Sequence, residues 1–349
     1  MDISAKVESI KYTPTMAKKN FSAYHIGDLE KALSQDGTFL LTVDNNNKFA
    51  MSWWVSAKRT RSYPYARVYD SFGFKGKRIT IIPICKDEGK DGDRDYLQYD
   101  TVFLMSLLQV YVIIGYYQSA TKNPSYKNKI TNQRFDIKYI HEEIKNLCNY
   151  HSDALHWNLE QLKKAPKIAE KSLNAYKEIS KKLGIEMHSE SDFRERIETL
   201  MKGVNEFLIL SRKLAKEAQN REMLTIQPKE SVERGKSKIT IKNYLGGYYY
   251  FTVDEAKIED KNVYLIEAKH TKTAKLPSEG DIKDGLIKMF LFTNLREVTI
   301  DRKVYNPIPV LKLTTGKPID EYEKLKLQPL EKEARINQFR ILLNKTYIL

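Results

Sequence analysis

The sequence has only two cysteines, Cys85 and Cys148, and neither belongs to a C-x-x-C pair. A disulfide framework and a zinc ribbon both need more cysteines at closer spacing, so these two classes of protein are excluded. The six histidines are also scattered, and His151 and His156 lack the H-E-x-x-H frame of a zinc hydrolase. So little cysteine is typical of a reducing compartment, which predicts a cytoplasmic protein.

Long apolar runs are missing as well. The longest, residues 102–117, contains Ser106 and Gln109 and is shorter than the ~20 residues that a membrane span needs. The first twenty residues contain no apolar core of a secretory signal. We therefore expect no membrane attachment, and we interpret residues 102–117 as a buried helix that runs into a buried strand.

Lysine and arginine, in contrast, are abundant. They number 59 against 45 aspartates and glutamates, which gives a formal net charge of +14 over 349 residues. Such an excess favours a polyanionic partner, and with membranes set aside that partner is nucleic acid. A protein whose surface is simply rich in lysine is the alternative interpretation.

Three regions differ in residue composition and hydrophobic pattern, and no repeat or low-complexity segment is visible. Residues 1–134 are rich in β-branched and aromatic runs, which predicts a β-rich region that we assign to DNA recognition. Residues 135–230 are helical in pattern, with Pro166 expected to interrupt one helix and Gly184 to end the next. Residues 231–349 return to strands and form the predicted catalytic core, whose first helix is expected from residues 192–220.

The C-terminal region predicts a mixed sheet flanked by helices, an α/β (mixed α+β) fold. Strand-like runs at 238–244, 247–256 and 262–270 precede a helical run at 280–295 and another strand-like run at 298–303. The prolines in YNPIPVLKL limit residues 305–313 to an edge strand or a loop. The tail, residues 321–345, is expected to form one or two helices.

A predicted hairpin brings three charged residues together. With a turn centred between Asp260 and Lys261, antiparallel partners have residue numbers that sum to about 521, so Asp254 lies opposite Glu267. Their Cβ atoms would be roughly 5 Å apart. Lys269 lies two residues beyond Glu267 and so projects from the same face.

Two carboxylates this close repel each other unless a cation lies between them. Mg²⁺ prefers one or two carboxylates and fills its other positions with water and phosphate oxygens. Bound metal lowers the pKa of its water and neutralises charge on a phosphate, while the lysine orients that water or stabilises the developing charge. The alternative is a surface hairpin with a cross-strand ion pair, which is common and contributes little stability.

These residues resemble the PD-(D/E)xK nuclease signature, and the likeness covers roughly residues 192–302. Val253-Asp254 is followed thirteen positions later by Glu267-Ala268-Lys269 at the end of an apolar strand, although Val253 replaces the usual proline. Within that superfamily the chain is most similar to type II restriction endonucleases. The resemblance implies a restriction-endonuclease-like core, Asp254 and Glu267 as Mg²⁺ ligands, and Lys269 as the catalytic lysine.

Many members of the superfamily add a glutamate from the helix before the first strand. Glu198 and Glu206 are both candidates here. Glu198 lies in a polar segment, whereas Glu206 is flanked by apolar residues and so is expected to face inward. Glu206 is therefore the favoured choice, and the identity of this residue stays open.

The function that follows is Mg²⁺-dependent hydrolysis of phosphodiester bonds in double-stranded DNA at a specific sequence. Cutting both strands of a symmetric site favours a homodimer, and a cognate DNA methyltransferase is expected in the same genome. A structure-specific or repair nuclease with the same site is one alternative. A DNA-binding protein without catalysis, whose carboxylates form salt bridges, is another.

Two basic segments are candidates for DNA contact. Residues 56–78 interleave cations with tyrosines, and residues 269–283 follow the catalytic strand. Cations contact phosphates, and arginine and aromatic side chains also stack on bases. A solvated strand–loop–strand explains residues 56–78 equally well. The predicted DNA-binding residues are Lys58, Arg59, Arg61, Arg67, Lys272 and Lys275.

An acidic segment at residues 86–100 is a second candidate metal site. Glycine-containing loops rich in carboxylates hold Ca²⁺ or Mg²⁺, but the spacing here lacks the last glutamate of an EF-hand loop. A solvated acidic loop is the simpler interpretation.

Overall fold

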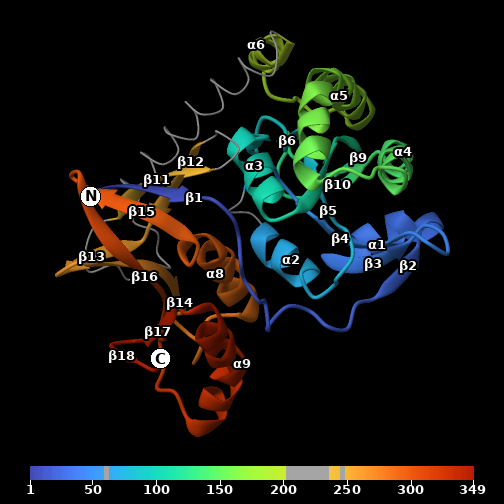
Figure 1. Ribbon diagram of the computed structural model, residues 1–349. Helices are drawn as coiled ribbons and strands as arrows, with labels where there is room; N and C mark the ends of the chain where they lie inside the picture. Colours follow the sequence, from blue (N-terminus) through green and yellow to red (C-terminus); the bar gives the residue numbers. More distant parts are fainter. Residues whose placement is uncertain (59–62, 202–235, 244–247) are drawn as a thin grey trace. The chain divides into compact units, whose positions relative to one another are not determined.

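The computed structural model describes residues 1–58, 63–201, 236–243 and 248–349 (Figure 1). The chain divides into two compact units. Unit 1 comprises residues 1–19 and the described part of residues 212–349, and unit 2 comprises residues 20–211, again where described.

Unit 1 is built on one mixed sheet of nine strands. Along the main path the order is β12-β11-β1-β15-β16-β14-β13, and β17 and β18 extend it from β16. Neighbouring strands are parallel in the pairs β1/β11, β14/β16 and β16/β17 and antiparallel elsewhere. The strands are β1 (Asp2–Val7), β11 (Ser237–Asn243), β12 (Tyr248–Val253), β13 (Glu255–Glu259), β14 (Asn262–His270), β15 (Leu295–Ile300), β16 (Lys303–Thr314), β17 (Arg340–Leu343) and β18 (Thr346–Tyr347).

The sheet curls because its two outermost strands follow each other in the chain. β12 pairs with β11 at one end of the path, and β13 pairs with β14 at the other. Only Asp254 separates β12 from β13, so the chain passes at this residue from one end of the sheet to the other. The predicted mixed sheet is confirmed. Asp254 lies where the chain stops pairing with β11 and starts pairing with β14.

The N-terminal strand belongs to this unit, which corrects the predicted regions. β1 lies between β11 and β15 and pairs with both. Residues 1–19 therefore fold with the C-terminal part of the chain rather than with the rest of the predicted region 1–134. Ile3, Ala5 and Val7 alternate along β1 and are buried, as expected for a strand that has one face on the core.

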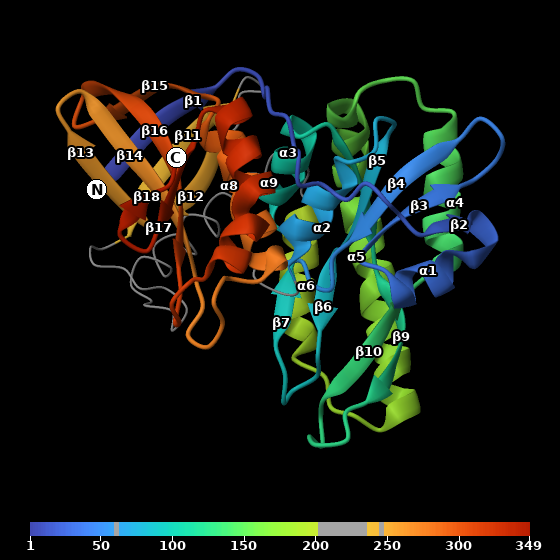
Figure 2. The ribbon, with the colours of Figure 1, turned by 90° about the horizontal axis from the view of Figure 1, so that it is seen from below.

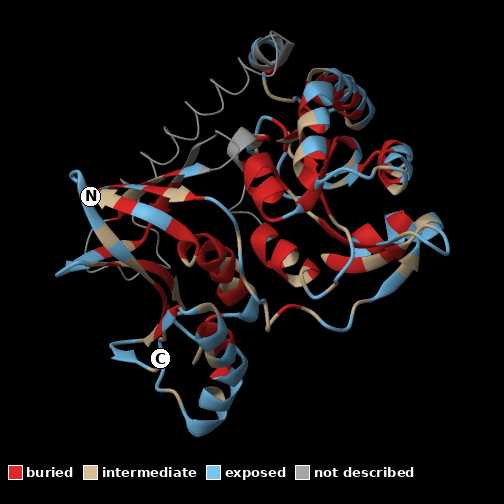
Figure 3. Cartoon of the chain, in the orientation of Figure 1, coloured by how far each residue is buried: buried red, intermediate tan, exposed pale blue. Residues whose placement is uncertain are grey.

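Two helices pack on the sheet of unit 1, α8 (Glu279–Phe292) and α9 (Glu321–Asn337). α8 connects β14 to the hairpin of β15 and β16 and packs against β14 and β16 (Figure 2). Figure 3 shows that α8 is almost wholly buried, whereas much of α9 is exposed. Part of the cover over α8 comes from the N-terminal segment, because Tyr12 stacks on Phe290 with ring centroids 3.9 Å apart.

β16 is a central strand, so the expected edge strand or loop at residues 305–313 was wrong. β16 pairs with β14 along one side and with β15 and then β17 along the other. The pairs with β15 end at Tyr305 and those with β17 begin at Val310. Pro307 and Pro309 lie between them, where β16 pairs with β14 alone, so the missing N–H groups interrupt no ladder.

The C-terminal tail is only partly helical. α9 ends at Asn337, and Gln338 adopts a left-handed φ of 59°. The apolar run that follows forms β17 and pairs in parallel with β16, which corrects the expectation of helix through residue 345. A short run of apolar residues is compatible with either a buried strand or a helix. Here pairing with β16 makes it a strand.

Unit 2 contains a five-stranded sheet in the order β2-β3-β4-β5-β8 and two small hairpins, β6/β7 and β9/β10. Its strands are β2 (Ala23–His25), β3 (Thr38–Thr42), β4 (Lys48–Trp53), β5 (Arg78–Pro83), β6 (Cys85–Asp87), β7 (Arg94–Tyr96), β8 (Val110–Gly115), β9 (Tyr117–Lys122) and β10 (Ile130–Phe135). Its helices are η1 (Ile26–Asp28), α1 (Leu29–Gln35), α2 (Pro64–Ser71), α3 (Tyr99–Leu107), α4 (Ile137–Cys148), α5 (Ala154–Leu183) and α6 (Glu190–Met201).

The predicted helix-to-strand run at residues 102–117 is confirmed by α3 and the fully buried β8. Gly184 caps α5 with a left-handed φ of 60°, as expected. Pro166, however, lies inside α5 and does not end it. Packing explains the difference, since Ala165, Ile168 and Ala169 are buried on the helix face that meets β8 and β9, and this burial outweighs the lost hydrogen bond.

In the part of the chain that the structure describes, every helix is too short or too polar to cross a membrane.

Candidate active site

The hairpin of β13 and β14 has the register that the sequence predicts. Each pair of partners has residue numbers that sum to 521, from Glu255 opposite Ile266 to Glu259 opposite Asn262. Asp260 opens the turn with a left-handed φ of 52°, a conformation that aspartate tolerates better than most residues. The predicted register of the hairpin is confirmed, and extended by one residue it would place Asp254 opposite Glu267.

Asp254 itself lies at the bend between β12 and β13, just outside the ladder. Its side chain is buried, with 3% of the residue exposed. Oδ2 of its carboxylate accepts a hydrogen bond of 2.8 Å from the backbone N–H of Ala268. This bond fixes Asp254 against β14 between Glu267 and Lys269.

Glu267 is a buried carboxylate held by two lysines. Lys288 Nζ lies 2.6 Å from Oε2, and Lys269 Nζ lies 3.0 Å from Oε1. Burial alone would raise the pKa of Glu267, but the ammonium groups of Lys288 and Lys269 outweigh it and hold the pKa at about 2. Glu267 is therefore ionised at neutral pH.

Lys269 is the residue on which the carboxylates converge. Its ammonium also lies 3.2 Å from Oδ2 of Asp284. Burial lowers the pKa of Lys269, but the negative charges of Glu267, Asp284 and Asp254 raise it above its ordinary value. Burial raises the pKa of Asp284, and Lys269 offsets part of that effect. We call Asp254, Glu267, Lys269, Asp284 and Lys288 the charged cluster.

Helix α8 supplies the two members of the cluster that sequence reasoning missed. Asp284 and Lys288 are four residues apart, so they lie on one face of the helix. Between them, Gly285 lets the helix approach β14 closely. A Cβ there would lie 3.1 Å from Lys269 Cε and 2.9 Å from Leu311 Cδ1. The available signal was a pair of opposite charges at helical spacing within an apolar helix.

The charged cluster contains the types of ligand atom that a hard divalent cation prefers, but these atoms are not arranged around one point. Carboxylate oxygens are the ligands that Mg²⁺ prefers, and three carboxylates interact with the Lys269 ammonium. Among the described side chains, however, no group of three or more His, Cys, Asp and Glu residues surrounds one point as metal ligands. Lysines contact both oxygens of Glu267.

The two candidate helix glutamates cannot be placed in this site. Glu206 lies outside the described residues. Glu198 belongs to α6, but its side chain also lies outside them. The additional helix glutamate stays a prediction.

Arg67, a predicted DNA-binding residue, makes contacts within unit 2, and its role in DNA binding stays a prediction. Its guanidinium donates a 2.9 Å hydrogen bond to the Trp53 carbonyl and lies over the Trp53 ring, 4.4 Å from the centroid. Burial lowers its pKa. Tyr65 and Tyr69, on the same helix α2, are also buried. Arg67 thus stabilises the fold of unit 2. To bind its guanidinium, a phosphate would have to displace the contacts with Trp53.

The other predicted DNA-binding residues have different surroundings. Lys58 pairs with Asp95 at 2.7 Å and keeps half of its side chain exposed. Arg59 and Arg61 lie outside the described residues. Lys272 is exposed on the loop after β14, and Lys275 pairs with Asp320 near the start of α9. Among the described members of this set, Lys272 is exposed, and Lys58 and Lys275 are each partly exposed and paired with an aspartate.

The acidic segment at residues 86–100 is held by protein cations. Asp87 is buried, lies 2.6 Å from Arg94 Nε and contacts His188. Glu88 pairs with Lys86 and Lys129 in the same way. These ion pairs join β6 to neighbouring segments of unit 2, so the segment is structural and the suggested second metal site is not supported.

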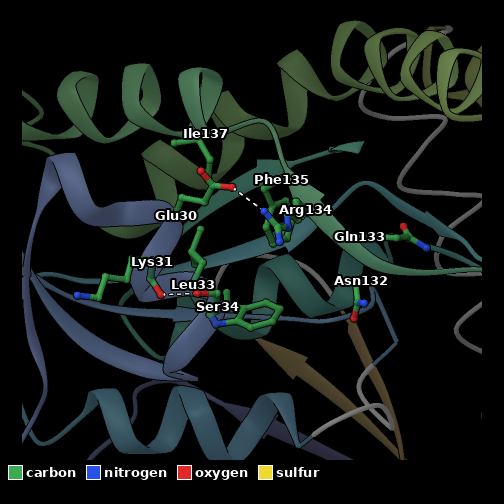
Figure 4. A pocket seen from close by; sticks show the side chains of 10 residues that line it. Glu30, Lys31, Leu33, Ser34, Asn132, Gln133, Arg134, Phe135 and Ile137 are labelled. Atoms are coloured by element: carbon green, nitrogen blue, oxygen red, sulfur yellow. Dashed lines mark hydrogen bonds and ion pairs between the residues drawn. The ribbon is translucent and has the colours of Figure 1, made fainter. Parts of the chain in front are cut away.

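Unit 2 also contains a hollow of about 590 Å³. Figure 4 shows Glu30 of α1 and Arg134 of β10 facing each other at this hollow, with Phe135 beside Arg134. Both members of the ion pair are more than half exposed. The lining mixes apolar rings with amides and one exposed ion pair, and it indicates no particular ligand.

Comparison of the chain with protein-family models, with curated proteins and with solved structures gives no match. The case for the charged cluster therefore rests on its geometry.

The low pKa of Glu267 predicts an acid-sensitive contribution to stability. Its pKa in the folded protein, about 2, lies below the ordinary value of 4.5, so the unfolded chain takes up the proton first. The ion pairs then contribute fully above about pH 4.5, and that stability is lost as the pH falls toward 2.

Urea unfolding without added metal measures this effect. Between those pH values the stability of the wild type should fall relative to that of Glu267→Gln by on the order of 3 kcal/mol. Parallel curves for the two proteins would contradict the ion-paired state of Glu267.

Proposed function

We propose that this protein is a Mg²⁺-dependent endonuclease of the PD-(D/E)xK type that cleaves double-stranded DNA in the manner of type II restriction enzymes. One observation carries the proposal. Asp254 and Glu267 are buried where β12, β13 and β14 meet, and the Lys269 ammonium lies 3.0 Å from Glu267 and interacts with the negative charge of Asp254. The net charge of +14 adds a reason for a nucleic-acid partner.

The order of elements around the site supports the same proposal. β11, β12 with β13, and β14 run antiparallel in turn, and α8 then leads to β16, which lies parallel to β14. The run of three strands followed by a helix fits the order of elements that the sequence pattern predicts for such a core. The hairpin of β15 and β16 and the inserted β1 are additions to that core.

A purely structural ion-pair cluster is the second candidate, and the contact between Lys288 and Glu267 favours it. Such a protein would bind DNA without cutting it. Buried ion pairs, however, are poor sources of stability, because apolar residues of similar size often do as well. Buried charged groups with shifted pKa values are more often found at functional sites. The cost of gathering five charged groups, of which Asp254, Glu267 and Lys288 are buried, therefore favours the enzyme.

Each member of the site has a definite task in the proposed reaction. A bound Mg²⁺ would supply an activated water and neutralise charge on the phosphate. Asp254 and Glu267 would hold it, Asp254 through the carboxylate that the Ala268 N–H orients. Lys269 carries a proton at neutral pH because its pKa is raised, so it donates to the water or to a phosphate oxygen. Asp284 positions Lys269 from α8.

Gly285→Ala should separate catalysis from stability. The added Cβ would approach Lys269 Cε and Leu311 Cδ1, so the lysine must shift. Alanine at a helix interior gains about 1 kcal/mol of helix propensity, which offsets part of the crowding. We expect the cleavage rate to fall about tenfold or more while the melting temperature stays close to that of the wild type. A normal cleavage rate would show that the position of Lys269 does not matter.

The proposed function is tested by incubating the purified protein with mixed plasmid and phage DNA and Mg²⁺, beside Glu267→Ala and Lys269→Ala. Discrete fragments that both variants fail to produce support the proposal. Smears or cuts at flaps favour a repair nuclease. Binding without cleavage under every divalent metal favours the structural cluster.

Two further expectations follow from the proposal. Cutting both strands of a symmetric site favours a homodimer on DNA. A restriction enzyme also needs its own genome protected, so a gene for a DNA methyltransferase is expected nearby, and both proteins would act in the cytoplasm.

A further inference from the structure

Lys288 is the closest cation to Glu267, although the hairpin pattern gave it no role. Its Nζ lies 2.6 Å from Glu267 Oε2, closer than Lys269 to the other oxygen. It also donates a 3.3 Å hydrogen bond to the carbonyl of Thr252 at the end of β12. Lys288 therefore reaches from α8 to both strands that carry the carboxylates, and its residue is only 9% exposed.

Charge balance explains why a cation lies there. Asp254, Glu267 and Asp284 bring three negative charges, and Lys269 and Lys288 bring two positive ones. Without Lys288, Glu267 would be buried beside a single lysine that it already shares with two other carboxylates. Lys288 thus stabilises the cluster in the absence of metal.

The same contact opposes metal binding. Oε2 of Glu267 faces Lys288, and a divalent cation on that oxygen would lie close to the ammonium. Like charges this close repel strongly in a buried site. For metal to bind, the ammonium must move away from Glu267, and the Thr252 carbonyl and Asp284, one helical turn earlier on α8, give it places to go.

We propose that Lys288 is an internal counter-cation that competes with the divalent metal for Glu267 and so sets the affinity of the site. This inference rests on the proposed function, because it assumes that Glu267 binds metal. It makes Lys288 a positioning residue that holds the empty site together and weakens metal binding.

Removal of the competing charge is the test. Lys288→Met keeps most of the length of the side chain without the charge, and the metal-free protein should be less stable than the wild type. Its affinity for Mg²⁺ or Ca²⁺, measured by calorimetry without DNA, should be about tenfold tighter or more. Lys288→Arg should restore the affinity of the wild type. Lys283→Met is the matched control, since Lys283 is another buried lysine of α8 and pairs with Glu279 instead.

The outcomes distinguish failure of the inference about Lys288 from failure of the proposed metal site. If Glu267→Gln abolishes metal binding while Lys288→Met binds no tighter than the wild type, the inference fails and the metal site stands. If Glu267→Gln binds metal as the wild type does, the proposed site fails and the inference with it. Should Lys288→Met fold only when excess Mg²⁺ is present, circular dichroism would show the same competition in its extreme form. A variant unfolded with and without metal would count against a metal able to replace the lysine.

Discussion

Replacing Lys269 with methionine is expected to lower the rate of DNA cleavage by about a hundredfold to a thousandfold, the usual effect of removing one donor that stabilises charge in a transition state. The fold should survive, because Lys288 still pairs with Glu267 and methionine fills most of the same volume. Single-turnover cleavage with Mg²⁺, beside circular dichroism, measures both effects. The loss should appear in the rate of the chemical step and not in the binding of DNA.

A matched control lies on the other face of the same sheet. Lys312 is opposite Ala268 in the pairing of β14 and β16, so it projects away from Glu267 and Lys269. It pairs with Glu255 at 3.2 Å and is similarly buried. Lys312→Met should therefore cleave DNA like the wild type. Equal losses in Lys269→Met and Lys312→Met would mean that the effect is one of folding.

Glu333→Ala should cause the largest loss of stability in unit 1. Glu333 is fully buried on α9 and holds the N-terminal segment with both carboxylate oxygens. Oε1 accepts from Tyr12 Oη at 2.9 Å, and Oε2 accepts from Met16 N at 2.8 Å and from Thr15 Oγ at 3.2 Å. Hydrogen bonds to a charged group contribute about 1.5–3 kcal/mol each, so we expect the free energy of unfolding to fall by about 3 kcal/mol or more.

Because Tyr12 also stacks on Phe290 of α8, release of this segment should expose the outer side of α8. Limited proteolysis should then cut within residues 8–19 of Glu333→Ala sooner than in the wild type. Glu333→Gln keeps one acceptor oxygen and should lie between the two proteins. Glu321→Ala, which removes an exposed glutamate of the same helix, should change neither measurement. Unchanged proteolysis in Glu333→Ala would disprove the anchoring role.

The parts of the site that depend on local sequence were predictable. A two-residue turn fixes the register of a hairpin, and period-two alternation then decides which side chains share a face. Asp254, Glu267 and Lys269 were found in this way, and the observed pairs confirm the register. The bend at Asp254 was not foreseen, because it arises where β12 leaves the hairpin to pair with β11.

The parts that depend on distant contacts were not predictable from the pattern. β1 is inserted between strands that lie more than two hundred residues away. Pro307 and Pro309 suggested an edge, yet a gap between β15 and β17 accepts them within a central strand. Lys288 meets Glu267 only after α8 packs on β14, and the spacing of Asp284 and Lys288 marks a charged side of α8 without indicating Glu267 as the partner.

The central claim is that Asp254, Glu267 and Lys269 form a metal-dependent phosphodiesterase site. Its most direct test is cleavage of one end-labelled duplex by the wild type, by Asp254→Asn and by Glu255→Gln, with Mg²⁺ and with the metal chelated. Glu255 is the neighbour of Asp254 that faces the other side of the sheet. We predict cleavage with Mg²⁺ by the wild type and by Glu255→Gln, no cleavage by Asp254→Asn, and none by any protein after chelation. Cleavage by Asp254→Asn at the rate of the wild type, or cleavage that persists after chelation, would contradict the claim.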